Sequence, residues 1–247
     1  MAGHSKWKQI KRKKAVTDAR RGAHFTKLIK EITVAARSGG GDPAGNARLR
    51  TAIDTAKAAN MPLDNIGRAI KKGTGALEGV QYEEITYEGY GPGGAAILIE
   101  VTTDNANRTV ADVRHIFAKH GGNLGASGSV AWMFDKRGQI YVDAARYGED
   151  TTMEAALDAG ATDVVREGEQ YIVTTGVTDL HAVQEGLTGR GVAPESAEIA
   201  MIPKSTVKVE GRNAETLVKL MEALEEHDDV SKVSSNFDVD LEALAGV

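Results

Sequence analysis

Cysteine is absent from the 247 residues of this chain. Its absence excludes disulfide bonds, thiolate metal sites and cysteine nucleophiles, and it fits the reducing conditions of the cytosol. No apolar run approaches the roughly 20 residues that a membrane-spanning helix needs. No apolar stretch follows the N-terminal charges, as it would in a secretory signal. We therefore expect a cytoplasmic protein that has no membrane partner.

Aromatic residues make up only 5% of the sequence, so few side chains can stack on nucleobases. Nucleophile elbows, phosphate-binding loops and metal-ligand spacings are also missing. The glycines of Gly89–Gly94 resemble a dinucleotide fingerprint, but a strand rather than a helix is predicted to follow them. A hairpin loop is the better interpretation. The sequence thus predicts no cofactor, no metal site and no catalytic residue, and we do not expect an enzyme.

Charge is present in quantity, and it is unevenly distributed. Residues 1–75 contain 17 Lys and Arg against 5 Asp and Glu, a net charge of +12. The remaining residues contain 13 against 30, a net charge of −17, and the two values sum to −5. Such asymmetry indicates a polyanionic partner for the basic part. Nucleic acid is the commonest one, because each neutralised phosphate releases counterions.

The basic segment, defined here as residues 3–14, contains six Lys and Arg residues together with His4 and no acid. A mitochondrial leader is also basic, but this run is rich in Lys and poor in Ser and leads directly into a predicted helix. We predict that its cations contact phosphates and that Trp7 either stacks on a base or packs on the helices beside Ile10. The predicted nucleic-acid-binding residues are Lys6, Trp7, Lys8, Lys11, Arg12, Lys13, Lys14, Arg20, Arg21 and Lys27.

Base-specific recognition has no support in the residues, because no helix-turn-helix, zinc finger or RNA-binding aromatic signature is present. Recognition of the backbone or of nucleic-acid shape is the safer interpretation. A purely solubilising role of the basic segment is the alternative, and other cations of the helical region would then have to form the binding face. Those residues are Arg48, Arg50, Arg68, Lys71 and Lys72.

Three amphipathic helices are predicted in the first domain, from Thr17 to about Arg37, from about Asn46 to Ala59, and from Pro62 to Gly73. In each one, apolar residues recur at helical spacing, which is typical of a small bundle. Gly67, inside the third helix, is expected to allow close packing. A hinge is predicted near residues 73–79, where the periodicity changes and the charge reverses.

The rest of the chain predicts strands and helices in alternation. Strands are expected at Glu83–Glu88, Ala95–Val101 and Val130–Phe134, and Thr109 with Asp112 nearly matches a capping box for the helix between the last two. From residue 138 to residue 203 the order is strand, helix, strand, strand, helix, strand, which is typical of a ferredoxin-like unit. A strand, a helix and a last strand then complete the pattern that preceded this unit.

The predicted fold class is therefore α+β with three domains. A basic N-terminal helical bundle spans residues 1–77. A middle α+β domain combines residues 78–136 with residues 205–247. A ferredoxin-like domain, residues 137–204, is inserted into the middle domain and offers an acidic surface on which a protein adaptor could dock its partner.

An enzymatic function has one set of candidates. The residues that offer a carboxylate, an amide, an arginine and histidines for hydrolysis or phosphoryl transfer are Asp104, Asn105, Arg108, His115 and His120. The two histidines are five residues apart and do not share a helix face, which argues against a paired metal site. The favoured interpretation is structural: Asp104 and Asn107 shape a loop, and Arg108 forms an ion pair at a helix start.

Several short motifs, in their order and spacing, resemble the YebC family. They are Gly3–Trp7, Lys13-Lys14, Asn60–Pro62, Tyr87–Gly94, Thr103–Asn105, Asn107–Thr109 and Gly121–Gly125. The resemblance spans the chain and implies the same three-domain layout. It also implies one of two functions: DNA-binding regulation of transcription, or action on the ribosome through rRNA, where elongation through proline-rich sequences is assisted. The family includes probable bacterial transcriptional regulators and the mitochondrial translational activator of cytochrome c oxidase subunit I.

Overall fold

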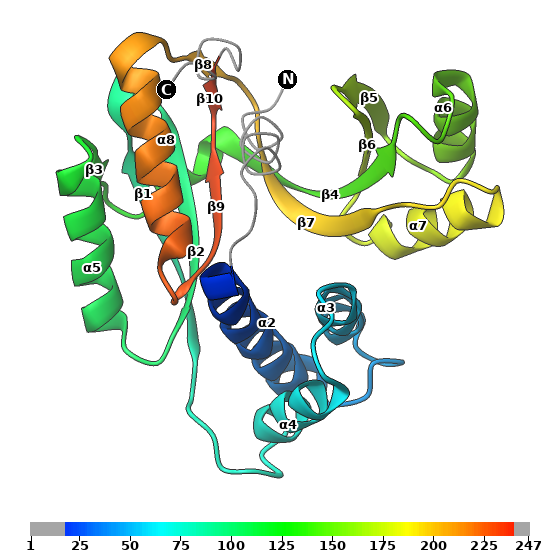
Figure 1. The fold of residues 1–247 in the computed structure, drawn as a ribbon, viewed down its shortest axis with the longest axis horizontal. Helices are drawn as coiled ribbons and strands as arrows, with labels where there is room; N and C mark the ends of the chain where they lie inside the picture. The colour runs from blue at the N-terminus through cyan, green and yellow to red at the C-terminus, as the bar shows by residue number, and fades with distance from the viewer. Residues whose placement is uncertain (1–17, 240–247) are drawn as a thin grey trace.

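The computed structural model describes residues 18–239, with side chains from residue 22 onward. Helices and antiparallel sheets combine in it, so the predicted α+β class is confirmed. The helices between residues 18 and 73 form one group, and two sheets with their own helices form the other groups (Figure 1). Each group has its own cluster of buried apolar side chains. No helix within residues 18–239 is long and apolar enough to cross a lipid bilayer.

The helical group contains α2 (Asp18–Gly39), α3 (Ala47–Ala58) and α4 (Leu63–Gly73), close to the predicted ranges. Close packing depends on Gly73 rather than Gly67. A Cβ atom at residue 73 would lie 2.4 Å from a carbonyl oxygen of α2, whereas one at residue 67 would meet nothing within 4 Å. The prediction for Gly67 was wrong because its side of α4 faces away from the other helices.

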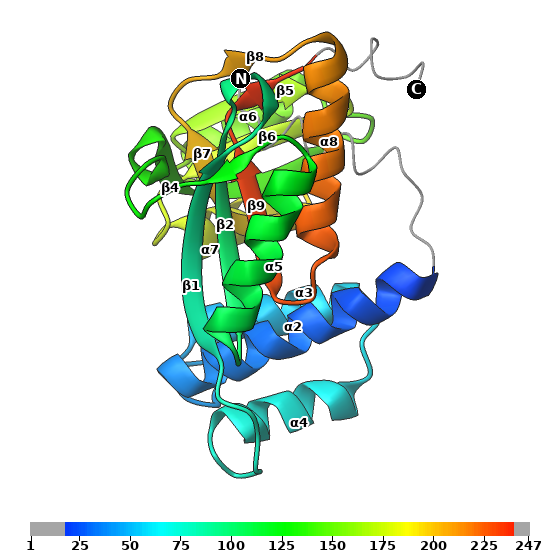
Figure 2. The same cartoon turned by 90° about the vertical axis from the view of Figure 1, so that its left-hand side faces the viewer.

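The middle sheet has the strand order β3-β1-β2-β9. Its two long helices are α5 and α8, and Figure 2 shows them side by side across one face of the sheet. β2 pairs on one side with β1 and on the other with β9, so the chain returns to this sheet after the second sheet is complete. The elements are β1 (Glu83–Tyr90), β2 (Ala96–Thr103), α5 (Ala106–Lys119), β3 (Asn123–Leu124), α8 (Gly211–Glu226) and β9 (Val230–Ser235). The predicted hairpin loop between β1 and β2 is present and contains the short helix η1 (Pro92–Gly94).

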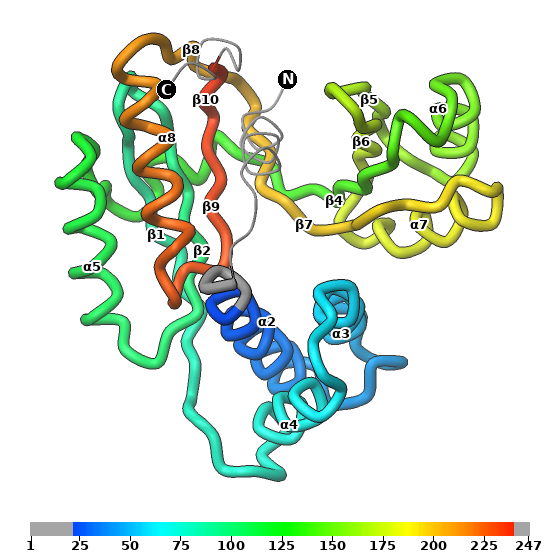
Figure 3. The backbone as a smooth tube through the Cα atoms, viewed as in Figure 1, coloured from blue at the N-terminus to red at the C-terminus, as the bar shows by residue number. Residues whose placement is uncertain are grey.

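The second sheet has the strand order β5-β6-β4-β7, and all its pairs are antiparallel. Helices α6 and α7 pack on one face of it, so the predicted order of elements from residue 138 to residue 203 is confirmed. β4 and β7 pair along their length and extend side by side away from the middle sheet (Figure 3). The elements are β4 (Phe134–Asp143), α6 (Glu149–Asp158), β5 (Asp163–Glu167), β6 (Gln170–Thr175), α7 (Leu180–Gly189) and β7 (Ser196–Pro203). A short parallel pair joins β8 (Val207–Lys208) to β10 (Phe237–Asp238).

The strand predicted at Val130–Phe134 is wrong. Residues Ala131–Met133 form the short helix η2, and Phe134 is the first residue of β4. The physical reason lies in Glu88 of β1. Its buried carboxylate accepts hydrogen bonds from the backbone N–H groups of Gly128, Val130 and Ala131 at 2.6, 2.7 and 2.7 Å. These donors are therefore satisfied by a side chain and not by a neighbouring strand.

We predict a large loss of stability when Glu88 is replaced by Gln. Burial alone would raise the pKa of Glu88, but the three backbone N–H groups lower it below its ordinary value. The charged form thus stabilises the fold at neutral pH, and this contribution disappears as the pH falls through the lowered pKa. Glu88→Gln replaces a charged acceptor and brings an amide N–H group toward backbone donors, so the free energy of unfolding should fall by about 2–4 kcal/mol in urea denaturation.

Glu83→Gln is the matched control, since Glu83 is exposed on the same strand. Its unfolding free energy should stay within about 0.5 kcal/mol of that of the unchanged protein. Equal losses from the two substitutions would contradict the role assigned to Glu88.

The connection between α4 and β1, residues 74–82, carries the predicted hinge. Arg37 of α2 donates hydrogen bonds to the carbonyl oxygens of Val80 and Tyr82, both at 3.3 Å. We expect glutamyl endopeptidase to cleave first at Glu78 and to release a basic helical fragment. Arg37→Ala should speed this cleavage about fivefold, because local opening becomes easier. Arg68→Ala is the control, and resistance of residues 74–82 in both variants would contradict the hinge.

Candidate nucleic-acid interface

Most of the predicted nucleic-acid-binding residues lie outside the described part of the chain. They are Lys6, Trp7, Lys8, Lys11, Arg12, Lys13 and Lys14. Arg20 and Arg21 belong to the start of α2, where only the backbone is described. Lys27 is the one member of the predicted set whose side chain is described, and its ammonium group donates to the carbonyl oxygen of Glu225 at the end of α8. Lys27 thus helps to attach α2 to the middle group.

Two arginines of α3 also contact other parts of the protein. The Arg48 guanidinium group forms ion pairs with Glu31 of α2 at 2.8 Å and with Glu84 of β1 at 2.5 Å. The hydrogen bonds that Arg48 donates to Glu84 and Glu31 raise the pKa of Arg48 above its ordinary value. Arg50 approaches the ring of His181 in α7, with 3.5 Å between the nitrogen atoms. Both arginines connect α3 to a sheet group, so they are poorly placed to neutralise phosphates.

Four exposed cations of the helical group have no hydrogen-bond or ion-pair partner for their side chains within the described residues. They are Lys57, Arg68, Lys71 and Lys72. The last three lie on α4 at positions i, i+3 and i+4 and therefore share one face of that helix. The opposite side of α4 buries Ile66 and Ala69 against α2. This face of α4 is the described part of the candidate interface.

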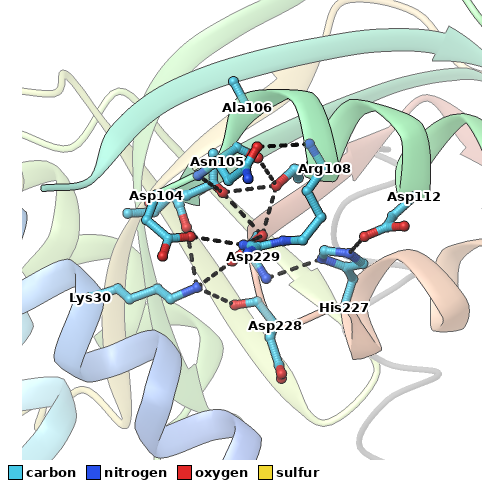
Figure 4. Close-up of polar contacts among 12 residues, drawn as sticks. Lys30, Asp104, Asn105, Ala106, Arg108, Asp112, His227, Asp228 and Asp229 are labelled. Carbon is cyan, nitrogen blue, oxygen red and sulfur yellow. Dashed lines mark hydrogen bonds and ion pairs between the residues drawn. The ribbon is translucent and has the colours of Figure 1, made fainter. Parts of the chain in front are cut away.

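A buried carboxylate joins α2 to the middle sheet. Asp229, beside the start of β9, accepts hydrogen bonds from Lys30 at 2.6 Å, Arg108 at 2.8 Å, Thr109 at 2.7 Å and Thr103 at 3.1 Å. Figure 4 shows how the Lys30 side chain reaches from α2 toward Asp229. We call these five residues the junction cluster.

The electrostatics of the junction cluster favour the charged forms. Burial alone would raise the pKa of Asp229, but hydrogen bonds from Lys30, Arg108 and Thr109 hold it far below its ordinary value. Hydrogen bonds to Asp229 and then to Asp104 raise the pKa of Arg108. Because the carboxylate is fully used by protein donors, it is not available as a general base or as a metal ligand.

Three of the enzymatic candidates, Asp104, Asn105 and Arg108, lie together at the start of α5, whereas the two histidines lie farther along the helix. Arg108 forms its ion pair with Asp104 at 2.9 Å, which confirms the structural interpretation of that pair at a helix start. His120, the C-cap of α5, lies twelve positions after Arg108, a distance of about 18 Å along the helix axis. Burial lowers the pKa of His120, and Lys119 and Lys219 lower it further. Within the described residues, no group of three or more His, Cys, Asp and Glu side chains could hold a metal ion.

The predicted capping box of α5 is wrong as well. Asn105, not Thr109, caps the helix by accepting a hydrogen bond from the Arg108 backbone N–H at 3.0 Å. Thr109 lies inside the first turn, fully buried, where its hydroxyl donates to Asp229. A polar residue near a helix start can be the N-cap or can lie in the first turn. The hydrogen bond to Asp229, which is distant in the sequence, places Thr109 in the first turn.

Sequence reasoning missed Lys30, Asp229 and Glu88 as structurally important charges. Lys30 lies next to the apolar stripe of α2, and this position was its only signal. Asp229 and Glu88 stand in acidic or polar stretches that resemble many solvated ones. Their partners come from segments that are distant in the sequence, so no local pattern marks them.

Two family models together match nearly the whole chain. Residues 5–76 match the TACO1/YebC protein N-terminal domain, and residues 82–237 match the TACO1/YebC second and third domain. A relative from Gemmatimonas aurantiaca is 61% identical over 245 residues, which is 99% of both chains, and is named a probable transcriptional regulatory protein. A relative from Acidithiobacillus ferrooxidans with the same name is 60% identical over 99% of this chain and 98% of its own.

A solved structure agrees with this relationship. The crystal structure of a conserved hypothetical protein from Aquifex aeolicus matches with a TM-score of 0.86 and 51% sequence identity. The match covers 94% of this chain and 96% of the Aquifex chain. On sequence and on fold alike, this chain belongs to the TACO1/YebC family.

Proposed function

We propose that this protein is a nucleic-acid-binding regulator of gene expression that controls transcription by binding DNA. The observation that carries the proposal is the segregation of charge, with +12 in residues 1–75 and −17 in the remainder. A polyanion is attracted to the first part and repelled by the second, so the charge fixes which end of the protein meets it. The name shared by the relatives from Gemmatimonas and Acidithiobacillus supports a regulatory role.

The contacts of the helical group support a division of labour among its cations. Lys27, Lys30 and Arg48 hold α2 and α3 on the rest of the protein. The exposed face of α4, with Arg68, Lys71 and Lys72, and the basic segment remain for the nucleic acid. Contacts of this kind reach phosphates, which position a protein on nucleic acid but carry no sequence information. The proposed function consists of binding and requires no catalytic step.

Crosslinking in cells, followed by sequencing of the bound nucleic acid, tests the proposal. Enrichment of promoter DNA is the expected result. Enrichment of rRNA would instead indicate action on the ribosome, which is the other function that the basic segment permits. A variant with Arg68, Lys71 and Lys72 changed to Ala should recover less nucleic acid of every sequence, because each lost phosphate contact weakens binding uniformly. Recovery of no nucleic acid above background would contradict both functions.

A further inference from the structure

Trp132 is a large aromatic side chain that the structure holds in place but does not bury. It lies in η2, and its indole Nε1–H donates to the carbonyl oxygen of Ser129 at 3.1 Å. Its own carbonyl oxygen accepts a hydrogen bond from the Lys204 ammonium group at 2.9 Å. Nevertheless 66% of Trp132 is exposed to solvent. The indole is thus fixed at its edge while much of its surface remains open.

The backbone beneath the indole is fixed too. The carboxylate of Glu88 holds the N–H groups of Val130 and Ala131, the two residues before Trp132. On the other side, the backbone N–H of Lys204 donates to the carbonyl oxygen of Met133 at 2.9 Å. A single exposed apolar residue needs no function by itself. This one has lost much of its conformational freedom before any ligand arrives, which lowers the cost of binding to it.

Three cations lie on the segments that adjoin Trp132 in the structure. Lys136 and Arg137 are exposed on β4, and Lys204 follows β7. Asp135 is the only acid among residues 132–137, and it lies 3.7 Å from Arg137 and 3.5 Å from Lys204. Arg137 and Lys204 together with Asp135 leave a local charge of +1, because Lys136 alternates with them along β4 and its charge acts on Glu84 of β1. An aromatic platform beside a basic track is the composition of sites for single-stranded nucleic acid.

Acidic residues limit this region on one side. Arg137 and Lys204 also line a cavity of about 470 Å³ over the open face of the second sheet, together with Asp163 and Glu167 of β5. β5 is two strands away from β4, a distance of about 10 Å at ordinary strand spacing. These carboxylates repel phosphates, so a bound strand is expected to pass over Trp132 and Lys204 and to avoid β5.

We propose that Trp132 is a stacking platform for an unpaired nucleobase, with Arg137 and Lys204 next to the adjoining phosphates. The inference rests on the proposed function, because it takes nucleic acid as the partner. It adds a preference for single strands. In a duplex both faces of an interior base are already stacked, whereas an unpaired base has a free face for the indole.

Fluorescence titration tests the platform directly. The chain has two tryptophans, so the Trp7→Phe variant reports from Trp132 alone. A single-stranded oligonucleotide should quench this fluorescence, and a duplex of the same sequence should quench it far less. Trp132→Ala should weaken single-strand affinity about 5- to 100-fold, as expected for the loss of one stacked base. Trp132→Phe should retain most of the affinity.

The salt dependence separates stacking from phosphate contacts. Trp132→Ala should leave the slope of log affinity against log salt unchanged, because the indole carries no charge. Leu63→Ala is the matched control, since Leu63 is 70% exposed on α4, and it should change neither value. Circular dichroism checks that all variants fold. Unchanged single-strand affinity in Trp132→Ala would overturn the platform and leave the proposed function intact. This holds whether or not the variant loses binding to a protein partner. Absence of any binding by the unchanged protein would overturn the proposed function itself.

Discussion

Replacing Lys11, Arg12, Lys13 and Lys14 by Ala should flatten the salt dependence of nucleic-acid binding. Six phosphate contacts give a slope of log affinity against log salt of about −4 to −5, at roughly 0.7–0.9 counterions per contact. The four substitutions should therefore lower the magnitude of the slope by about 3. Affinity at low salt should fall about 100-fold or more for all sequences alike, because contacts with phosphates do not distinguish bases. Fluorescence anisotropy over a series of salt concentrations measures both effects.

The matched control removes four exposed cations from the acidic part of the chain. These residues are Arg114, Lys119, Arg212 and Lys219, on α5 and α8. The net charge changes by the same amount, but the slope should stay near that of the unchanged protein. A folded basic-segment variant that keeps its slope would assign the binding to another surface. The exposed face of α4 would then carry the phosphate contacts without the basic segment.

Asp229→Asn should be the most damaging single substitution for stability among the charged residues described here. It leaves the buried ammonium group of Lys30 without a carboxylate, whereas Arg108 keeps its ion pair with Asp104. Removing one partner of a buried ion pair costs about 3–5 kcal/mol, because the remaining charge stays buried and unpaired. Unfolding in urea, followed by circular dichroism, should show this loss. Hydrogen exchange should show that α2 loses protection.

The pH dependence has a defined sign. The pKa of Asp229 is lower in the folded protein than in the unfolded chain, so the unfolded chain takes up the proton first. The contribution of Asp229 is fully present above the unfolded pKa, near 4, and disappears as the pH falls through the folded value. Asp229→Asn should therefore reduce the acid sensitivity of unfolding between about pH 4 and the folded pKa.

Asp228→Asn is the control for this substitution. Its side chain is exposed, and only its backbone carbonyl oxygen accepts a hydrogen bond from Lys30, at 3.0 Å. The control should lose less than about 0.5 kcal/mol. A double substitution, Lys30→Met with Asp229→Leu, should be less damaging than Asp229→Asn, since apolar pairs can replace a buried ion pair. A loss below about 1 kcal/mol in Asp229→Asn would contradict the junction cluster as a stabilising contact.

The sequence by itself determined the elements whose signals are local. Apolar spacing located α2, α3 and α4, and the order of strands and helices between residues 138 and 203 was predicted correctly. Glycines and proline indicated the turn between β1 and β2. Charge counts need no structure at all, so the contrast between residues 1–75 and the remainder was complete from the start. The predicted roles of the basic segment stay predictions, because its residues lie outside the described range.

Only the tertiary structure decided which charges are buried and which remain free. Lys30 and Lys72 look alike in the sequence, yet one is paired with Asp229 across about 200 residues and the other is exposed on α4. Glu88 turned a predicted strand into η2 by binding backbone donors some 40 residues away. The same contacts hold the backbone before Trp132, whose side chain is exposed. A side chain's partner depends on how distant segments fold together, and a local sequence pattern does not contain that information.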